Sequence, residues 1–435
     1  MKIIGDNSTY KKEVNIGNKM YDFNSMKDLE QKYDTSFYLM DVNKLRSNFN
    51  KINKAFKSKY ENFIIGYSYK TNYIPFLCKE LSKLGAYAEV VSRLEYDLAI
   101  KLGEDPKKII FNGPLKSKND IFLALEYESI INIDSHYEID YVKDYALNNP
   151  NKQIKIGLRV NFDISDESGA SPLQGGFKVS RFGICEENAN LKNILNELKI
   201  VNNINIVGFH GHFSTSTRTI EHYKKITQKL CQLAKEHIPD TVEFIDVGGG
   251  IYGELPACFN KIVPTFEDYA EAICGIMNCE FDCSSKKPAL ILEPGTAVVA
   301  NVFLFVAKVI ETKTIQNQSF VLVDGSIQNI KATTQKFNLP MSILRQNKHK
   351  CSKRLFDIVG YTCMEKDYLA HEIYAKLPEI NDYIIFENVG AYTIVFTPPF
   401  IKERPAVIAV DNDQVFVVRK KETIRQFFNE ELYSF

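Results

Sequence analysis

FIIGYSYKTNYIPFLCKELSKLGAYAEVVSRLEYDLAIKLG, residues 63–103, is the stretch that decides the fold. Two short runs of β-branched and aromatic residues, at 63–69 and 87–92, are each followed by a longer amphipathic segment. Alternation of strand and helix patterns over such distances is typical of parallel βαβ units. We therefore predict a parallel sheet whose strands are connected by helices.

The same alternation continues on both sides of this stretch. FYLMD (37–41) and a helical segment precede it, and six more strand-like runs follow it: IIFNG, SIINID, IKIGLRV, INIVGFHGHF, EFIDVGGG and ALILEPG. Sustained over residues 36–299, the pattern suits an α/β fold of the (β/α)8 TIM-like barrel type better than an open sheet. A chain of 435 residues also exceeds what one hydrophobic core usually supports, so a second domain is expected.

The pattern changes after residue 299. Residues 300–435 hold strand-like runs and turns with little helix, which predicts an all-β domain, and residues 1–35 are expected to join it. The longest apolar run, residues 296–310, contains Asn301 and Lys308 and is shorter than the roughly 20 residues of a membrane span. We therefore expect a strand there and no membrane association.

The composition is that of a globular protein and excludes some functional classes. Apolar residues make up 45%, and 54 basic residues balance 54 acidic ones, which argues against a nucleic-acid-binding protein. The N-terminal residues lack an apolar run long enough for a signal peptide, and nine scattered cysteines indicate reduced thiols in the cytoplasm. Cys274, Cys279 and Cys283 cluster, but their spacing matches no common zinc pattern.

Polar residues recur where the predicted strands end, which is where barrel enzymes hold their active sites. They are Lys70, Glu89, Glu95, Arg159, His210, His212, Gly248, Gly249, Gly250 and Glu293. Each has an ordinary explanation: a lysine at a strand end is usually solvated, an arginine in a strand is usually ion-paired, and three glycines usually form a turn. The two histidines would face the same side of a strand, as hydrogen-bonded core residues or zinc ligands. Those explanations do not account for the gathering of all these groups at one end of one barrel.

The chemistry of pyridoxal phosphate (PLP) does account for it. The cofactor needs a lysine amine, here Lys70, with which it forms a Schiff base. Its pyridine nitrogen needs an acid such as Glu293 if the ring is to act as an electron sink. An imidazole such as His212 can stack on the ring. We therefore predict a PLP enzyme with no metal ion.

The phosphate of PLP has its own requirements. It needs backbone N–H groups that approach closely, and hydroxyl groups that donate to it. The sequence offers the first at Gly249 and Gly250, and the second at Ser214, Thr215 and Ser216. We predict that these two segments bind the phosphate.

The order of the motifs gives a specific resemblance. YSYKTN, AEVVSRLE, LRVN, SRFG, GFHGHFST, DVGGG, ILEPG, GYTC and VGAY follow one another between residues 35 and 400. In this order they resemble the fold type III PLP-dependent decarboxylases, which act on ornithine, arginine or diaminopimelate. The resemblance implies an alanine racemase-like barrel followed by a β domain. It also implies a head-to-tail homodimer whose active sites lie at the interface.

The resemblance assigns roles to residues at matching positions. Lys70 matches the Schiff-base lysine, Glu293 the partner of the pyridine nitrogen, and His212 the ring-stacking imidazole. Cys363 in GYTC matches a cysteine that reaches into the partner's site and protonates Cα of the substrate. The remaining matches bind the cofactor. Thr215, Gly249, Gly250 and Gly295 match phosphate ligands. Glu89, Glu95 and Arg159 match a supporting charged layer behind the cofactor, and Tyr392 in VGAY matches a tyrosine near it.

Three departures from the family pattern concern the substrate. Thr296 follows EPG, where many relatives have an arginine, although its hydroxyl still suits phosphate. Met364 follows the interface cysteine, at the position where ornithine and diaminopimelate enzymes have an acid that binds the distal amine of the substrate. Asp367 still fits a more distal acid of that motif. Residues 324–346 lack the acid and the Arg-Pro-containing stretch of those two classes.

These departures argue against the obvious substrates. A buried ammonium group without a partner is costly, so a pocket without the acid suits a dibasic amino acid poorly. We expect an amino acid or amino-acid conjugate with a larger, neutral or acidic tail. Lys331 or Arg345 would read such a tail.

Alternatives from other functional classes remain open. An amino-acid racemase shares the domain plan, but racemases of this kind pair the pyridine nitrogen with an arginine and not with an acid such as Glu293. A non-catalytic relative that binds and regulates an active enzyme would tend to lose the lysine or the cysteine, and this chain keeps both. A metallohydrolase built on His210 and His212 would make the lysine and the carboxylates coincidental.

Overall fold

The structure, a computed structural model, describes residues 8–10, 13–166, 168–284, 287–330, 337–346 and 352–435. The chain divides into two compact units. One consists of Asn48–Gly253 and Ile262–Ala297, and the other of Met1–Ser47, Glu254–Lys261 and Val298–Phe435.

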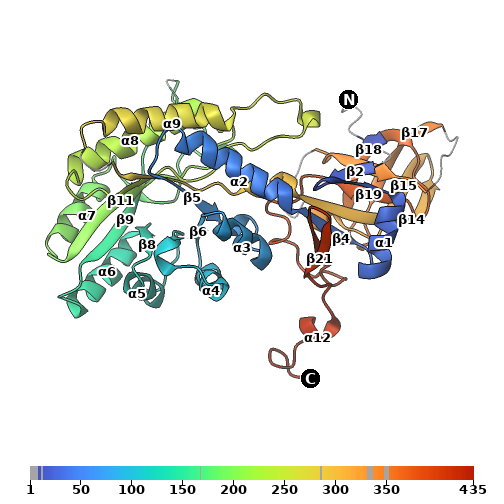
Figure 1. Cartoon of the computed structure of the whole chain (residues 1–435), viewed down its shortest axis with the longest axis horizontal. Coiled ribbons are helices and arrows are strands. Elements are labelled where there is room, and N and C mark those ends of the chain that lie inside the picture. Colours follow the sequence, from blue (N-terminus) through green and yellow to red (C-terminus); the bar gives the residue numbers. More distant parts are fainter. Residues whose placement is uncertain (1–7, 11–12, 167, 285–286, 331–336, 347–351) are drawn as a thin grey trace. The chain divides into compact units, whose positions relative to one another are not determined.

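The unit that begins at Asn48 is a closed parallel barrel with helices around it (Figure 1). Its eight strands are β5 (Phe63–Ser68), β6 (Tyr87–Val90), β7 (Ile109–Phe111), β8 (Ile130–Ile133), β9 (Ile154–Asn161), β11 (Ile204–His210), β12 (Phe244–Asp246) and β13 (Ala289–Leu292). Each strand pairs with the next, and β13 pairs with β5 to close the ring. The short β10 (Ile184–Cys185) adds to β9 outside the ring. The predicted (β/α)8 barrel is confirmed.

Helices alternate with these strands as the sequence pattern predicted. They are α2 (Val42–Lys57), α3 (Pro75–Lys83), α4 (Arg93–Leu102), α5 (Lys118–Glu126), α6 (His136–Asn148), α7 (Asn190–Lys199), α8 (Ile220–His237) and α9 (Phe266–Glu280). Local sequence fixes several ends, since Ser117 and Thr265 form capping boxes that start α5 and α9, and Gly103 ends α4 with a φ of 87°. Of the helices that the structure describes, none has both the length and the apolar character to cross a membrane.

The other unit is built on a mixed ten-stranded sheet. Its strands are β1 (Ser8–Tyr10), β4 (Phe37–Asp41), β14 (Phe303–Ile315), β15 (Gln318–Val323), β16 (Met341–Leu344), β17 (Lys353–Val359), β18 (Tyr368–Lys376), β19 (Tyr383–Phe386), β20 (Ala406–Asp411) and β21 (Gln414–Arg419). The early residues contribute β1, which pairs with β16, a hairpin of β2 (Glu13–Ile16) and β3 (Lys19–Asp22), and helix α1 (Phe23–Tyr33). Apart from a 3-10 turn at its start, Ala300–Val302, the short α11 (Ile327–Ile330) and α12 (Ile424–Phe427) are the helical elements in the described part of the C-terminal segment, so the all-β expectation is confirmed.

Two local expectations were wrong. FYLMD forms β4, which pairs with β14 and β20 in this sheet and is not the first barrel strand. All five of its residues are buried, and the four apolar residues in a row from Phe37 to Met40 fit a central strand of either sheet. Residues 296–310 are not a single strand, because α10 (Thr296–Val299) and a 3-10 turn, Ala300–Val302, precede β14. Val298 and Val299 are fully buried there, and packing outweighs the weak β preference of valine.

The three clustered cysteines differ in exposure. Cys274 is buried, whereas Cys279 and Cys283 are exposed, and all cysteines in the described ranges are free thiols. These three do not form one of the groups of close metal-ligand atoms found among the described residues.

Candidate active site

Lys70 lies in the 3-10 turn Tyr69–Thr71 that directly follows β5. Its Nζ donates to both carboxylate oxygens of Glu89 on β6, at 2.7 and 3.0 Å. The Glu89 side chain is fully buried, whereas that of Lys70 is 34% exposed. The lysine is therefore held by an ion pair at the mouth of the barrel and is not a solvated strand end.

Asn112, which follows β7, joins two carboxylates of the site. Its Nδ2 donates to Glu89 Oε1 at 3.1 Å and to Glu293 Oε1 at 2.5 Å. Its Oδ1 accepts from Asn132 Nδ2 at 2.8 Å. Both amide hydrogens and the amide oxygen are thus used, which fixes the orientation of the side chain. A hydrogen-bonded series runs from Lys70 through Glu89 and Asn112 to Glu293.

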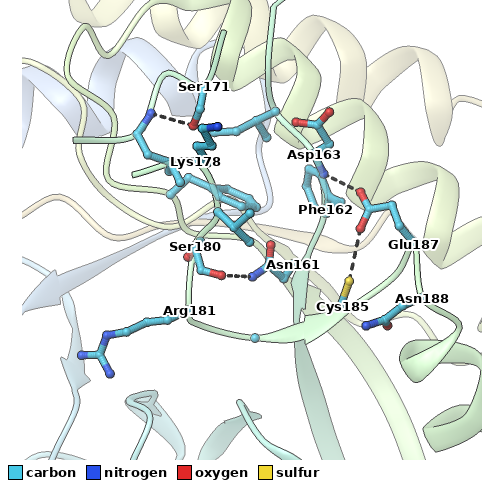
Figure 2. Close-up of a pocket in the computed structure, with 15 residues that line it drawn as sticks. Asn161, Phe162, Asp163, Ser171, Lys178, Ser180, Arg181, Cys185, Glu187 and Asn188 are labelled. Atoms are coloured by element: carbon cyan, nitrogen blue, oxygen red, sulfur yellow. Dashed lines mark hydrogen bonds between the residues drawn. The ribbon is translucent and has the colours of Figure 1, made fainter. Parts of the chain in front are cut away.

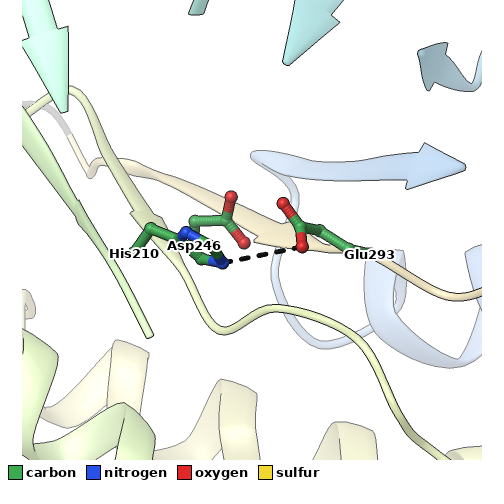
Figure 3. A group of neighbouring side chains, drawn as sticks. All are labelled: His210, Asp246 and Glu293. Carbon is green, nitrogen blue, oxygen red and sulfur yellow. Dashed lines mark ion pairs between the residues drawn. The ribbon is translucent and has the colours of Figure 1, made fainter. Parts of the chain in front are cut away.

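Glu293 follows β13 and lies in a buried cluster with His210 and Asp246, the last residues of β11 and β12 (Figure 3). Its Oε2 is 3.6 Å from His210 Nε2. Burial opposes ionisation of Glu293, but the charges of His210 and Lys70 outweigh it and hold the pKa of this carboxyl below its ordinary value. Burial first, and then the charge of Glu293, raise the pKa of Asp246 well above its ordinary value.

The same three side chains have ligand atoms close enough for a metal ion. A nitrogen of His210 and oxygens of Asp246 and Glu293 all lie within 4.8 Å of one another. His212 does not belong to this group. β11 ends at His210, so the strand alternation expected to place both histidines on one side does not extend to His212.

Arg159 on β9 connects His212 to the barrel. Its guanidinium donates to Asp134 Oδ1 at 2.9 Å and to the carbonyl oxygen of His212 at 3.2 Å. The N–H of Gly249 donates to His212 Nδ1 at 3.1 Å. Burial, followed by the charges of Arg159 and Lys70, lowers the pKa of His212 to about 3. The imidazole is therefore neutral, with Nδ1 as an acceptor and its hydrogen on Nε2.

The glycine turn after β12 requires residues without a side chain. Gly248 and Gly250 have φ values of 67° and 98°, in the region that favours glycine. A Cβ at Gly249 would collide with the carbonyl oxygen of Glu293, and the hydroxyl of Tyr223 donates to the carbonyl of Gly249 at 2.8 Å. The turn therefore packs its backbone directly against the segment that carries Glu293.

The remaining barrel candidates surround this core. Ser214 is exposed and its Oγ bonds to Gln174 Oε1 at 2.9 Å, whereas Thr215 is buried and accepts from the N–H of Arg218 at 3.1 Å. A Cβ at Gly295 would collide with the Thr71 hydroxyl, so the backbone of the EPG motif also approaches the Lys70 turn closely. Thr296 begins α10 directly after this glycine.

Glu95 lies in the first turn of α4. Its Oε2 accepts from the N–H of Val91 at 2.8 Å. Burial raises the pKa of Glu95 to about 7. Its effect on Lys70 is therefore one of charge at a distance.

Two cavities share lining residues in the segment from Leu173 to Arg181. The first, of about 560 Å³, is lined by Arg159, His212, Ser214 and the segment from Leu173 to Phe182. The guanidinium groups of Arg159 and Arg181 lie 4.7 and 4.3 Å from the centre of the Phe182 ring. Figure 2 shows the second cavity, of about 470 Å³, where Asn161 bonds to the carbonyl of Ser180. Only the first cavity is lined by predicted cofactor residues.

In the β unit, Cys363 is exposed on the loop between β17 and β18. Met364 beside it is half-buried. Asp367 is buried, and its carboxylate accepts from Ser326 Oγ, the N–H of Ile327, and both the N–H and Oγ1 of Thr362, at 2.7 to 3.1 Å. Asp367 therefore fastens the loop that carries Cys363.

The other candidates of the β unit have structural surroundings. The guanidinium of Arg345 donates to the carbonyls of Leu377 and Lys376 and lies 3.6 Å from Asp382. Tyr392 is half-buried, with a φ of 54°. Lys331 lies outside the described residues.

The sequence interpretation missed four residues of the barrel site: Asn112, Asp134, Tyr223 and Asp246. A signal existed for three of them, because Asn112 and Asp134 directly follow strands and Asp246 ends one. For Tyr223, in the middle of an amphipathic helix, the sequence offers no such signal.

A closed parallel barrel with a lysine, a buried glutamate and a glycine turn at its carboxyl end, followed by a β domain, defines the alanine racemase-like class of PLP proteins. Residues 42–300 match the family model described as pyridoxal-dependent decarboxylase, pyridoxal binding domain. The chain therefore belongs to the pyridoxal-dependent decarboxylase family. It is a PLP-dependent carboxy-lyase, as the motif order predicted.

The relatives are consistent with this family. The chain is 27% identical over 420 residues to diaminopimelate decarboxylase of Methanocaldococcus jannaschii, and the match covers 94% of each chain. A solved structure of diaminopimelate decarboxylase from that organism aligns with a TM-score of 0.85 at 25% identity, covering 100% of this chain and 99% of the other. Diaminopimelate decarboxylase from Helicobacter pylori, complexed with L-lysine, aligns with a TM-score of 0.80 at 25% identity, covering 94% and 99%.

The residues of the barrel fit PLP. Glu293 is a buried carboxylate that its neighbours keep ionised, and such a group needs a cationic partner. A protonated pyridine nitrogen supplies one. Lys70 offers an amine, and the face of a neutral His212 imidazole suits an aromatic ring. The amine of Lys70, the carboxylate of Glu293, the imidazole of His212 and the glycine turn therefore suit PLP, the cofactor of the family.

Proposed function

We propose that the chain removes the α-carboxylate of an amino acid, or of an amino-acid conjugate, whose side chain is not simply dibasic. The observation that carries this proposal is the hydrogen-bonded series from Lys70 through Glu89 and Asn112 to Glu293. It brings the amine that would hold PLP and the acid that would face its pyridine nitrogen to one end of the barrel.

Each residue of the series has a chemical task. Bound PLP supplies the electron sink for the negative charge that remains on Cα when CO2 departs. Lys70 would supply the amine that holds PLP, and Glu89 accepts hydrogen bonds from its Nζ. Glu293 stays anionic and so favours a protonated pyridine nitrogen. His212, held by Gly249 and Arg159, would offer its imidazole face to the ring, and the glycine turn and Thr215 would hold the phosphate.

The protonation step is assigned to Cys363 of a second copy. The resemblance of GYTC and the exposure of its thiol support this assignment. We propose a homodimer in which each copy completes the site of the other. Cys363→Ala should retain PLP but slow protonation at Cα, or direct the proton to another carbon and yield a transamination product. A C363A enzyme with wild-type rate and product would refute the assignment, and Cys279→Ala, which changes another exposed thiol, is the control.

The substrate preference follows from charge. Arg159, which is paired with Asp134, and Arg181 both line the cavity beside His212, and the guanidinium of Arg181 disfavours a distal ammonium in that space. Met364 cannot pair with such an ammonium either. A neutral or acidic tail suits this cavity better.

Diaminopimelate is the second candidate, because the relatives reported above carry that name. Its distal end bears both an amine and a carboxylate, and the carboxylate could pair with Arg181. Thr296 and Met364, which replace an arginine and an acid, weaken this candidate.

The test is CO2 release by the holoenzyme from a panel of L- and D-amino acids and their conjugates. Diaminopimelate, ornithine, lysine and arginine are included, and Lys70→Ala is the control that should lose both the absorbance of bound PLP and all activity. Fastest release from ornithine, lysine or arginine would overturn the substrate proposal. Fastest release from diaminopimelate would replace it with the second candidate. Racemisation without CO2 would identify a racemase, and wild-type protein without bound PLP would indicate a regulator.

A further inference from the structure

Two charged side chains that the proposed reaction does not use are buried where the chain leaves β7 and β8. Lys116 lies on the segment between β7 and α5, and Glu138 lies in the first turn of α6. Both side chains are 0% exposed, and Lys116 Nζ is 3.1 Å from Glu138 Oε2. Lysine and glutamate are almost never buried completely unless they are paired. The two residues therefore form a buried pair beside the candidate site.

Stability alone does not explain this pair. Burial lowers the pKa of Lys116 and raises that of Glu138, so the charged forms of both groups are disfavoured where they lie. Glu138 Oε1 is also buried without a hydrogen-bond partner in the described part of the chain. Replacing a buried ion pair with apolar residues of similar volume is often neutral or stabilising. What the pair holds in place therefore matters more than the attraction between its charges.

Lys116 holds the turn that carries Asn112. Its Nζ donates to the carbonyl oxygen of Gly113, the residue after Asn112, at 2.7 Å. Gly113 has a φ of 96°, and a Cβ there would collide with the carbonyl oxygen of Val91, so this turn packs tightly against the residue that follows β6. Lys116 thus fixes the backbone from which Asn112 reaches the two carboxylates of the site.

Glu138 holds the neighbouring turn, which carries Asp134. Its Oε2 accepts from the N–H of Asp134 at 3.0 Å, and this is the oxygen that faces the lysine. Asp134 in turn accepts from the guanidinium of Arg159, which donates to the carbonyl oxygen of His212. The pair therefore joins the turn that carries Asn112 to the turn that orients Arg159 and His212.

We propose that Lys116 and Glu138 are positioning residues, which hold these two turns in one arrangement and thereby set how PLP lies between Glu293 and the His212 imidazole. The proposal rests on the proposed function, because that function gives these two groups the pyridine ring to hold. Both members of the pair are fully buried and act through backbone groups of the turns. Removal of the pair should therefore weaken and reorient bound PLP without removing any group that PLP contacts.

The experiment uses the double variant Lys116→Met/Glu138→Leu, loaded with PLP. It replaces both charges with apolar side chains of similar volume, so no unpaired charge is left inside the protein and the variant should fold. Absorbance titration gives the Kd for PLP, and circular dichroism of the visible PLP band reports the asymmetry of its surroundings. Neither readout depends on turnover. We expect the Kd to rise about tenfold, which corresponds to the loss of roughly one hydrogen bond, and the visible dichroism to change in amplitude.

Two further variants separate positioning from stability. Lys116→Met/Glu138→Gln is also neutral and keeps an oxygen for the N–H of Asp134, but it cuts the bond to Gly113, so its Kd should rise by less than that of the first variant. Tyr96→Phe is the control, because it breaks a buried 2.9 Å bond to Ser129, which precedes β8 at the opposite end of the barrel. It should lower the urea midpoint of unfolding and leave both PLP readouts unchanged.

The outcomes separate this proposal from the proposed function. Wild-type Kd and dichroism in either folded double variant would overturn the proposal. An equal rise in Kd for Tyr96→Phe, at a matched loss of midpoint, would also overturn it, because general destabilisation would then explain the effect. If the wild-type protein binds no PLP, or Lys70→Ala keeps the absorbance of bound PLP, the proposed function fails instead.

Discussion

Replacing Asn112 with leucine removes the amide that joins the two central carboxylates of the site. Asn112 donates to Glu89 and Glu293 and accepts from Asn132, and it is almost fully buried. Leucine has a similar volume, so it removes the hydrogen bonds without opening space for water. Glu89 and Glu293 would then each lose a donor inside the barrel.

The magnitude follows from the number and type of bonds. A hydrogen bond to a charged group contributes about 1.5–3 kcal/mol, so two lost bonds destabilise the apoprotein by about 3–6 kcal/mol. Only the bond to Glu293 bears directly on the pyridine nitrogen. Its loss alone corresponds to PLP binding that is about 10- to 150-fold weaker.

Two measurements check this prediction: absorbance titration of apoprotein with PLP, and the urea midpoint of unfolding. Asn112→Ala leaves room for water to replace the amide, so its losses should be smaller. Asn205→Leu breaks an exposed amide–amide bond to Gln153 on the same barrel and should change stability by no more than about 0.5 kcal/mol. If Asn112→Leu binds PLP as tightly as the wild type, with an unchanged midpoint, the bridge does not organise the carboxylates.

Three further predictions concern single positions. Gly249→Ala forces a methyl group against the carbonyl of Glu293, so it should cost about 1–3 kcal/mol of stability and weaken PLP binding. Gly275→Ala on α9, where a Cβ meets nothing within 4 Å, should instead stabilise the protein by about 0.5–1 kcal/mol. The same urea and absorbance assays measure both variants. Because the pKa of His212 falls from 6.5 to about 3 on folding, its contribution to stability is complete above pH 6.5 and is lost as the pH falls toward 3. His212→Gln should therefore flatten the acid limb of the stability profile of the apoprotein, and an unchanged limb would contradict a neutral imidazole in the folded protein. Because the pKa of Glu95 rises from 4.5 to about 7 on folding, the stability of the protein falls as the pH rises through 7. Glu95→Gln should therefore be about 1–3 kcal/mol more stable than the wild type at pH 8 and equally stable at pH 4. Equal stability of the two proteins at both pH values would count against the buried acid.

The barrel was predictable because its strands and helices differ in period. Each buried strand between residues 63 and 292 is short, apolar and followed by a helical pattern, so element type and order followed directly from the sequence. The place of FYLMD was not predictable in this way. Its five buried residues satisfy the central position of either sheet, and only pairing with β14 and β20, some 260 and 370 residues away in the chain, assigns it.

The candidate site was predictable where a residue type is chemically distinctive. Lys70, Glu89, Arg159 and His212 could be singled out because charged or basic side chains recur at successive strand ends of one barrel, and the structure connects them by hydrogen bonds to the same end of that barrel. Asn112 was missed because an asparagine after a strand is an ordinary turn residue. Its role depends on a partner 181 residues away, a relation that strand patterns do not encode.

The closure of the ring by β13 against β5 has a consequence for synthesis of the protein. Lys70 follows the first barrel strand and Glu293 the last, yet Ser68 Oγ donates to the carbonyl of Glu293 at 3.1 Å. A nascent chain that has emerged only as far as α9 carries the lysine but lacks the glutamate, and its first strand has no neighbour on that edge. We therefore expect PLP to bind only after the final barrel strand has left the ribosome. The cofactor would then bind a closed barrel and would not assist the folding of an open one.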